Sequence, residues 1–209
     1  MKEGKFKPEI LEEKPKNPEK KQFTDKEWID AYKEMYREFD IKIDISKIEI
    51  PEATKERPDL MIIPKKLSNE ELFEKIKKLI PTAKRQDDLD EQIKRSVQSN
   101  EDESYAIRLK FQQEIPEEFF DKRNVEKVRK YRLDQNCMTL KERLILELMY
   151  YRQTGKYLDK KSATLCAGSI ERNGCVPVVF PGCEVVSLSY KNLYPGIGPR
   201  YVTRKLKKR

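Results

Sequence analysis

Residues 200–209, RYVTRKLKKR, carry the clearest chemistry in the chain, because six of these ten residues are Arg or Lys and none is acidic. Cations at this density favour binding to phosphates, and six phosphate contacts would give a log-log salt dependence of about −5 on duplex DNA. The six cations are Arg200, Arg204, Lys205, Lys207, Lys208 and Arg209. The pattern predicts a nucleic-acid contact. An acidic protein partner and a solvated end are the alternatives.

The net charge supports this reading, because the excess of positive charge is concentrated at one end. The chain has 45 basic and 37 acidic residues, a net charge of +8. Residues 194–209 contain the same six cations and no carboxylate, which leaves a net charge of only +2 for residues 1–193. The rest of the surface should therefore carry a balanced mixture of both signs.

Cysteine is the next residue type that could do chemistry, and the chain has four: Cys137, Cys166, Cys175 and Cys183. Eight and seven residues separate the last three, so no closely spaced pair is present to begin a zinc site. Histidine is absent, which removes the commonest general base and metal ligand. We expect ordinary thiols, with no metal and no cofactor.

The acidic run RQDDLDE could in principle hold Mg²⁺ through Asp87, Asp88, Asp90 and Glu91. Acidic residues in the first turn of a helix also complement the helix dipole, and Asp88 can cap such a helix. Capping is the favoured interpretation. No phosphate-binding glycine loop is present in the sequence. These patterns together predict a protein that is not an enzyme.

Three capping boxes predict where helices begin: Thr24–Glu27, Ser68–Glu71 and Thr139–Glu142. The helix that follows Thr24 has an aromatic stripe, which includes Trp28, Tyr32 and Tyr36. Such a stripe forms either a core face or a docking face for a partner. The helix that follows Thr139 is expected to end at Gly155.

Alternating residues predict the strands. Residues 41–50 predict a strand with a bulge or two short strands, and residues 59–64, DLMIIP, predict a short buried strand. Residues 104–111 predict a strand with Arg108 and Lys110 on a basic outer face, which could extend the phosphate contacts. Residues 85–97 predict a short helix, residues 117–134 two helical pieces, and the chain beyond Gly155 a β meander. The fold class is α+β, with a mixed or antiparallel sheet packed against helices.

The composition divides the chain into four parts. Residues 1–22 predict a disordered arm, 23–58 an N-terminal helix and strand element, 59–199 the α+β domain, and 200–209 the basic C-terminal segment. The first 22 residues contain no apolar signal region, and no run of 18 apolar residues could span a membrane. We therefore expect a cytoplasmic protein with no membrane partner.

Several pieces of the sequence resemble a group of small uncharacterised proteins from environmental bacterial genomes of candidate lineages. The pieces are IIPKKLSNEELFEKI, RQDDLD, SYAIR, TLKERLILEL, YRQTGKYLD, TLCAGS and GCVPVV. The resemblance covers about residues 60–206 and implies that they form one unit, with residues 24–50 attached. Further tryptophans are usual near the end of the group's pattern, and none is present there in this chain. The resemblance implies no function.

Two functions follow as hypotheses. The first is a non-enzymatic accessory protein that contacts nucleic-acid phosphates through the basic C-terminal segment. The alternative is a protein-interaction or inhibitory module that docks through the aromatic N-terminal helix, and an origin in a mobile element is considered for it.

Overall fold

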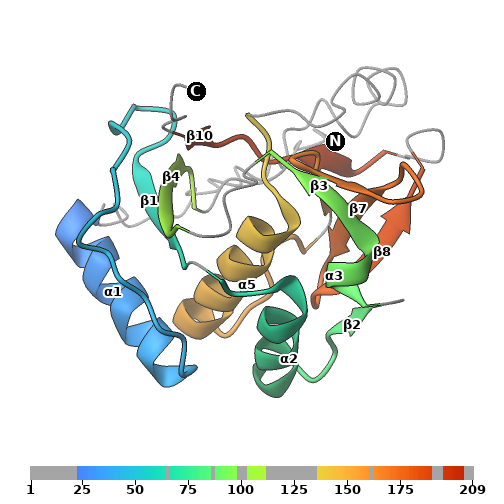
Figure 1. Ribbon diagram of the computed structural model, residues 1–209, viewed down its shortest axis with the longest axis horizontal. Coiled ribbons are helices and arrows are strands. Elements are labelled where there is room, and N and C mark those ends of the chain that lie inside the picture. The colour runs from blue at the N-terminus through green and yellow to red at the C-terminus, as the bar shows by residue number, and fades with distance from the viewer. Residues whose placement is uncertain are drawn as a thin grey trace, which may run out of the picture.

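The computed structural model describes residues 23–64, 66–85, 88–97, 103–111, 136–160, 162–189 and 195–204. The arm predicted for residues 1–22, the helical pieces predicted for 117–134 and the cations of residues 205–209 lie outside these ranges. The fold is α+β, as predicted. A three-stranded sheet lies on one side of the central helix α5 (Leu140–Thr154) and a five-stranded sheet on the other (Figure 1).

Capping boxes begin the three longer helices of the described residues, which are α1 (Asp25–Glu38), α2 (Asn69–Leu79) and α5. Each hydroxyl accepts a hydrogen bond from the amide three residues later, over 3.3 Å at Thr24, 3.0 Å at Ser68 and 3.2 Å at Thr139. The glutamate of each box bonds back to the cap amide, so two donors without a helical partner are satisfied at each start. Gly155 ends α5 in the left-handed conformation with φ of 63°, as the sequence predicts.

The three-stranded sheet, which we call the small sheet, is antiparallel and has the strand order β1-β4-β10. Its strands are β1 (Asp59–Ile63), β4 (Tyr105–Leu109) and β10 (Thr203–Arg204). Helix α1 packs on β1, and the Tyr36 hydroxyl donates a hydrogen bond to the carbonyl oxygen of Ile62. The aromatic stripe of α1 therefore belongs to the hydrophobic core.

The larger sheet has the order β2-β8-β7-β5-β9 and is mixed. Strands β7 (Val176–Phe180) and β8 (Glu184–Leu188) form an antiparallel hairpin, and β5 (Ala163–Leu165) pairs antiparallel with β7. The two edge strands, β2 (Lys84–Arg85) and β9 (Ile197–Pro199), pair in parallel with β8 and β5. A separate ribbon pairs β3 (Ile93–Ser96) with β6 (Ser169–Glu171).

Two sequence-based predictions of secondary structure are wrong. Residues 41–50 form no strand, and Asp44 instead holds a turn by accepting a hydrogen bond from the Ser46 amide over 3.0 Å. Their alternating isoleucines pack against the core from an extended segment, which gives a strand-like pattern without a sheet partner. The helix predicted for residues 85–97 is only α3 (Leu89–Gln92), because the residues that follow pair with β6 instead.

Helix α5 is the centre of the fold, and most of its residues are buried, charged ones included. The loop before it packs closely against the turn at Gly168, where a Cβ atom would lie 2.6 Å from the carbonyl oxygen of Cys137. Only glycine fits this approach without a shift of the backbone.

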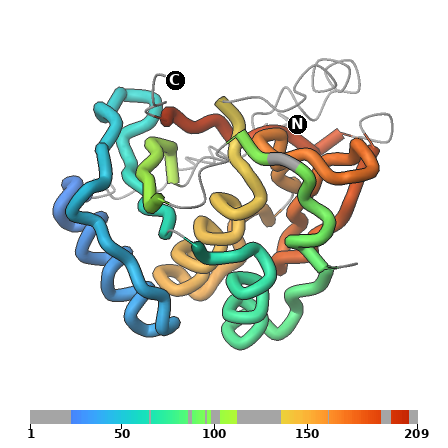
Figure 2. Tube along the Cα trace, in the orientation of Figure 1, coloured from blue at the N-terminus to red at the C-terminus, as the bar shows by residue number. Residues whose placement is uncertain are grey.

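Residues 197–204, which we call the strap, connect the two sheets across the end of α5 where this helix begins (Figure 2). The strap contributes β9 to the larger sheet and β10 to the smaller one. Between these strands, the Met138 amide donates to the carbonyl oxygen of Arg200 over 2.9 Å, and the Val202 amide donates to that of Asn136 over 2.8 Å. Two residues of the predicted basic segment, Arg200 and Arg204, therefore lie inside the folded structure.

Candidate nucleic-acid interface

Arg204, the last described residue, is anchored to the start of α5. Its Nε donates to Glu142 Oε1 over 3.1 Å, and one terminal nitrogen donates to the carbonyl oxygen of Cys137 over 2.8 Å. The same nitrogen also pairs with Glu142 Oε2, and the side chain of Arg204 is only 3% exposed. The expectation that Arg204 is available to phosphates is therefore wrong in this folded state.

Glu142, the partner of Arg204, has two further contacts. It accepts a hydrogen bond from the Thr139 amide over 2.7 Å, as the glutamate of the capping box, and another from the Tyr105 hydroxyl over 3.1 Å. A fully buried carboxylate is stable only when its oxygens are paired and hydrogen-bonded. One glutamate thus joins the start of α5, β4 and β10.

Arg200, the first residue of the basic segment, is also buried. Its guanidinium pairs with Asp159 Oδ1, and its Nε donates to Thr164 Oγ1 over 3.1 Å. The other oxygen of Asp159 accepts from Arg143 over 3.0 Å and from the Thr164 hydroxyl over 2.5 Å. The guanidinium of Arg200 is therefore buried and paired with Asp159, and it cannot contact a phosphate in this folded state.

Arg143 completes this buried network. It donates to Glu147 Oε2 over 2.7 Å, one turn later on α5, and to Thr164 Oγ1 over 3.0 Å. Burial raises the pKa of Asp159, but Arg143 and Arg200 outweigh that effect and hold this pKa below its ordinary value. Burial likewise lowers the pKa of Arg143, and the charges of Glu147 and Asp159 more than reverse that change. Asp159 and Arg143 are therefore held in their charged forms as a pair.

Arg108 was expected on a basic outer face of its strand, and this expectation is wrong. Its side chain is 2% exposed and makes a two-nitrogen contact with the Asp25 carboxylate over 2.7 and 2.6 Å. It also donates to the carbonyl oxygens of Pro51 and Pro58. Arg108 fastens the start of α1 to the small sheet, because Asp25 lies in the first turn of that helix.

Lys110 is exposed, but it does not continue the basic segment. In the antiparallel register Thr203 faces Arg108 and Arg204 faces Ile107, so β10 runs toward Tyr105. Lys110 follows the opposite end of β4. The chain therefore leaves the small sheet in the direction away from Lys110, and the continuous track of cations that the sequence suggested is not formed by the described residues.

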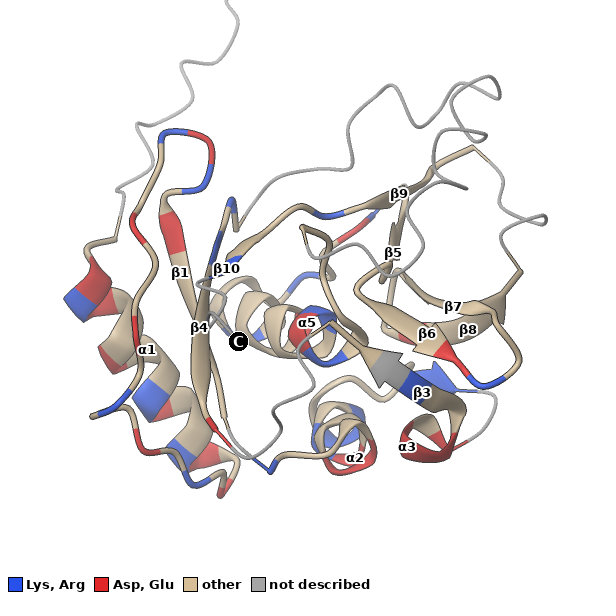
Figure 3. Ribbon diagram, turned by 45° about the horizontal axis from the view of Figure 1, so that its top comes forward, with Lys and Arg blue, Asp and Glu red and all other residues tan. Residues whose placement is uncertain are grey.

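The three aromatic residues predicted to dock a partner, Trp28, Tyr32 and Tyr36, are buried at 4%, 1% and 0% exposure. Trp28 packs on the ring of Phe111 with centroids 5.0 Å apart. Acidic and basic residues are both distributed along α1 (Figure 3). The stripe is therefore a core face, and the structure offers no exposed aromatic surface on this helix.

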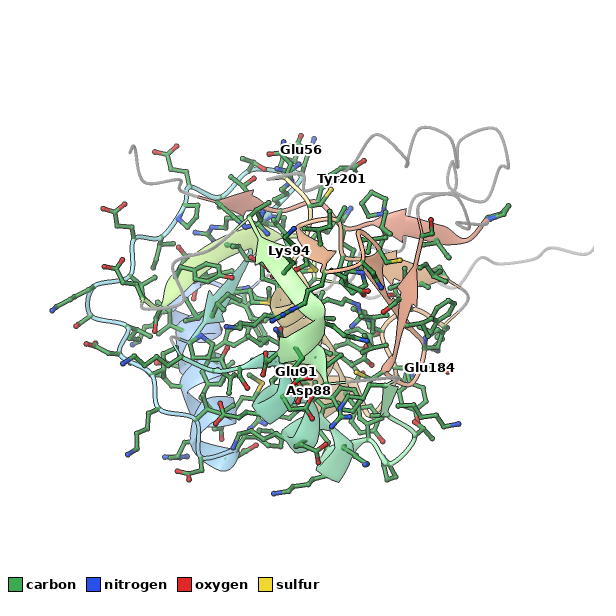
Figure 4. The ribbon with its side chains drawn as sticks, turned by 45° about the vertical axis from the view of Figure 1, so that its right-hand side comes forward. Glu56, Asp88, Glu91, Lys94, Glu184 and Tyr201 are labelled. Atoms are coloured by element: carbon green, nitrogen blue, oxygen red, sulfur yellow. The ribbon has the colours of Figure 1, made fainter. Side chains whose placement is uncertain are left out.

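The acidic run serves as helix caps, as favoured from the sequence. Asp88 accepts hydrogen bonds from the amides of Asp90 and Glu91, over 2.9 and 3.0 Å. Asp90 accepts from the Asn69 amide over 2.8 Å and so caps α2 from outside. Asp88 and Glu91 lie beside each other at α3, well below Tyr201 of the strap in the view of Figure 4. Asp87 lies outside the described residues.

All four cysteines are free thiols, and three are buried: Cys137, Cys166 and Cys183. Burial raises the pKa of Cys183 to about 12 and also raises that of Cys166. No group of three or more His, Cys, Asp or Glu residues in the described ranges could hold a metal ion. In the same ranges, no helix has the length and apolar character needed to cross a membrane.

The anchoring roles of Glu142, Asp159, Arg143 and Glu147 were not predicted from the sequence. A signal for two of them is present, because Arg143 and Glu147 are four residues apart in a helix that a capping box begins. Arg143 directly precedes the otherwise apolar stretch LILELM, and Glu147 interrupts it. Charged residues in a helix that is apolar on most sides indicate a buried ion pair. Nothing in the sequence near Asp159 identifies its partners.

No protein-family model, curated protein or solved structure matches this chain. The resemblance to small proteins from environmental bacterial genomes therefore stays a prediction.

Proposed function

We propose that the protein binds nucleic-acid phosphates through residues 205–209, KLKKR, immediately after the anchored Arg204. The observation that carries this proposal is the anchor of Arg204 on Glu142 and on the carbonyl oxygen of Cys137. It fixes the position of Arg204, after which the sequence continues with four cations within five residues, Lys205, Lys207, Lys208 and Arg209. A rigid domain that presents a short cationic segment suits contact with a phosphate backbone.

The ion pairs of the strap change the expected number of phosphate contacts. Arg200 and Arg204 are neutralised by buried carboxylates, so at most four of the original six cations remain for phosphate contacts. Four phosphate contacts give a log-log salt slope of about −3.6 on duplex DNA, against about −5 for six. The slope therefore distinguishes the folded arrangement from a fully extended basic segment.

Phosphate contacts carry no sequence information, so unrelated sequences should bind with similar affinity. The proposed partner is nucleic acid as a polyanion, and the protein would act as an accessory factor without a catalytic role.

The test measures binding of fluorescent random-sequence duplex DNA, single-stranded DNA and single-stranded RNA by the full chain over a salt series. The variant K205Q/K207Q/K208Q/R209Q removes the four cations and keeps the anchored Arg204. The matched control is K26Q/K33Q/K42Q/K47Q, which removes the same total charge at four exposed lysines elsewhere. A shortened chain should end at Arg204, because ending at Pro199 would also remove the two buried arginines.

We expect the wild type and the control variant to bind with a slope near −3.6, and the first variant to lose most of its binding. If both variants lose binding equally, the total charge and not residues 205–209 would be responsible. If the wild type does not bind at low salt, the proposal is wrong.

A further inference from the structure

Both strands of the strap lie at sheet edges. Among the residues that the structure describes, strand β9 pairs only with β5, and β10 pairs only with β4. Each is short, with three and two residues, so the strap contributes little backbone pairing to either sheet. Its other attachments include loop hydrogen bonds, the Cys137–Tyr201 bridge, the buried side chains of Ile197 and Val202, and the two arginines. The Arg57 side chain also donates to the carbonyl oxygen of Val202 over 3.2 Å and to the Thr203 hydroxyl over 2.6 Å. A segment attached at two edges can separate from the rest without breaking the internal pairing of either sheet.

The carboxylates that hold the strap keep other partners without it. Asp159 is also bonded to Arg143 and Thr164, and Glu142 is also bonded to the Thr139 amide and Tyr105. Removal of one partner from a buried charge is most costly when that charge is left alone. Here Asp159 keeps its ion pair with Arg143, and Glu142 keeps two neutral hydrogen-bond donors, so neither carboxylate is left without a partner when the strap separates.

The surface under the strap is acidic. It contains Glu142, Glu147 and Asp159 against the single positive charge of Arg143. The two strap arginines bring this group to neutrality when the strap is bound. The strap is therefore held as an arginine-containing peptide would be held by an acidic receptor.

We propose that residues 197–204 open and close as one unit on this acidic surface, while α5 and the internal pairing of both sheets stay folded. In the open form, Arg200 and Arg204 leave their carboxylates and join the four cations of residues 205–209. This consequence for phosphate binding rests on the proposed function, whereas the opening itself does not.

The test is native-state hydrogen exchange on the full chain without any nucleic acid, over a series of low denaturant concentrations. Three amides report on the strap: Val202 bonded to Asn136, Met138 bonded to Arg200, and Ala163 bonded to the carbonyl oxygen of Gly196. Amides in the middle of α5 report on global unfolding. We expect the three reporters to exchange together and at least about tenfold faster than the middle of α5.

Two variants separate opening from unfolding. Ile76→Val shortens a buried side chain of α2, at the end of the molecule away from β10 (Figure 1). It should speed exchange in the middle of α5 by about fivefold and leave the three reporters unchanged, because it affects the open and closed forms equally. Arg204→Gln destabilises only the closed form, so it should speed the reporters and α5 alike.

The proposal is overturned if the reporters follow α5 in the Ile76→Val variant, because the strap would then open only by global unfolding. Comparison of the wild type with Ile76→Val distinguishes local opening of the strap from global unfolding even if Arg204→Gln does not fold. Because no polyanion is present, failure of the strap proposal would be distinct from failure of nucleic-acid binding.

Discussion

The two ends of α5 both hold arginine–carboxylate pairs, but in opposite surroundings. Near its start, Arg143 is fully buried with Glu147 and Asp159, which are 0% and 1% exposed. Near its end, Arg152 pairs with Glu34 and Glu38 of α1, which are 54% and 45% exposed. The chemistry is the same, yet only the buried pairs must be satisfied for the fold to form, because water can replace the partners at the exposed end.

The buried end also shows why these charges are kept in pairs. The carboxylates of Glu147 and Asp159 compensate Arg143, while Glu142 and Asp159 compensate the two strap arginines. At the exposed end, the two nitrogen contacts of Arg152 with Glu38, over 2.6 and 2.5 Å, help to fasten α1 to α5. The buried ion pairs near the start of α5 are part of the core, whereas the Arg152 pairs near its end help to hold α1 against α5.

Arg143→Met should give the largest effect. It leaves Glu147 without its arginine in the interior, which costs about 3–5 kcal/mol in the free energy of unfolding. Urea unfolding followed by circular dichroism measures this loss. The second variant Arg143→Met/Glu147→Leu replaces both charges with apolar groups and should recover part of the loss. If Arg143→Met alone were as stable as the wild type, the buried ion pairs would not be needed for stability.

Acid should lower the free energy of unfolding through Asp159, which belongs to the buried ion pairs near the start of α5. The folded pKa of Asp159 lies below the ordinary value of 3.8, so its stabilisation is present above that value and is lost as the pH falls through the folded pKa. Unfolding free energies measured from about pH 5 to about pH 2 should therefore decrease. Asp159→Asn should show a shallower decrease over the same range. An equal slope in both proteins would mean that Asp159 is not responsible.

Arg152→Met should have the smallest effect and serves as the matched control for Arg143→Met on the same helix. Exposed ion pairs contribute at most about 1 kcal/mol, and salt weakens them. The loss should shrink further when the urea titration is repeated in high salt. If Arg152→Met instead costs as much as Arg143→Met, burial does not explain the difference between the two ends.

Local patterns in the sequence predicted the elements whose signals are contained within a few residues. The three capping boxes gave correct helix starts, and Gly155 gave a correct helix end, because each depends on hydrogen bonds between residues three to five apart. The strand at residues 41–50 was wrong because alternation reports on side-chain burial and not on sheet pairing. Pairing with β6 likewise replaced the last turns of the helix expected before residue 97.

The candidate interface was predicted in part. The cluster of cations is plain in the sequence, but the partners of those cations are not. Arg204 meets Glu142 across 62 residues, and Arg200 meets Asp159 across 41. The same holds for Arg108, whose partner Asp25 is 83 residues away. Composition counts such charges as available, and only the folded chain shows that they are neutralised.

The sequence by itself determined the α+β class, the caps of the main helices and the concentration of positive charge in residues 200–209, because each follows from neighbouring residues or from composition. Only the tertiary structure decided that Arg200 and Arg204 are neutralised in the interior. Burial removes water from an arginine and so requires a carboxylate or carbonyl partner, and those partners come from distant parts of the chain. The anchoring of these two arginines is therefore a property of the fold.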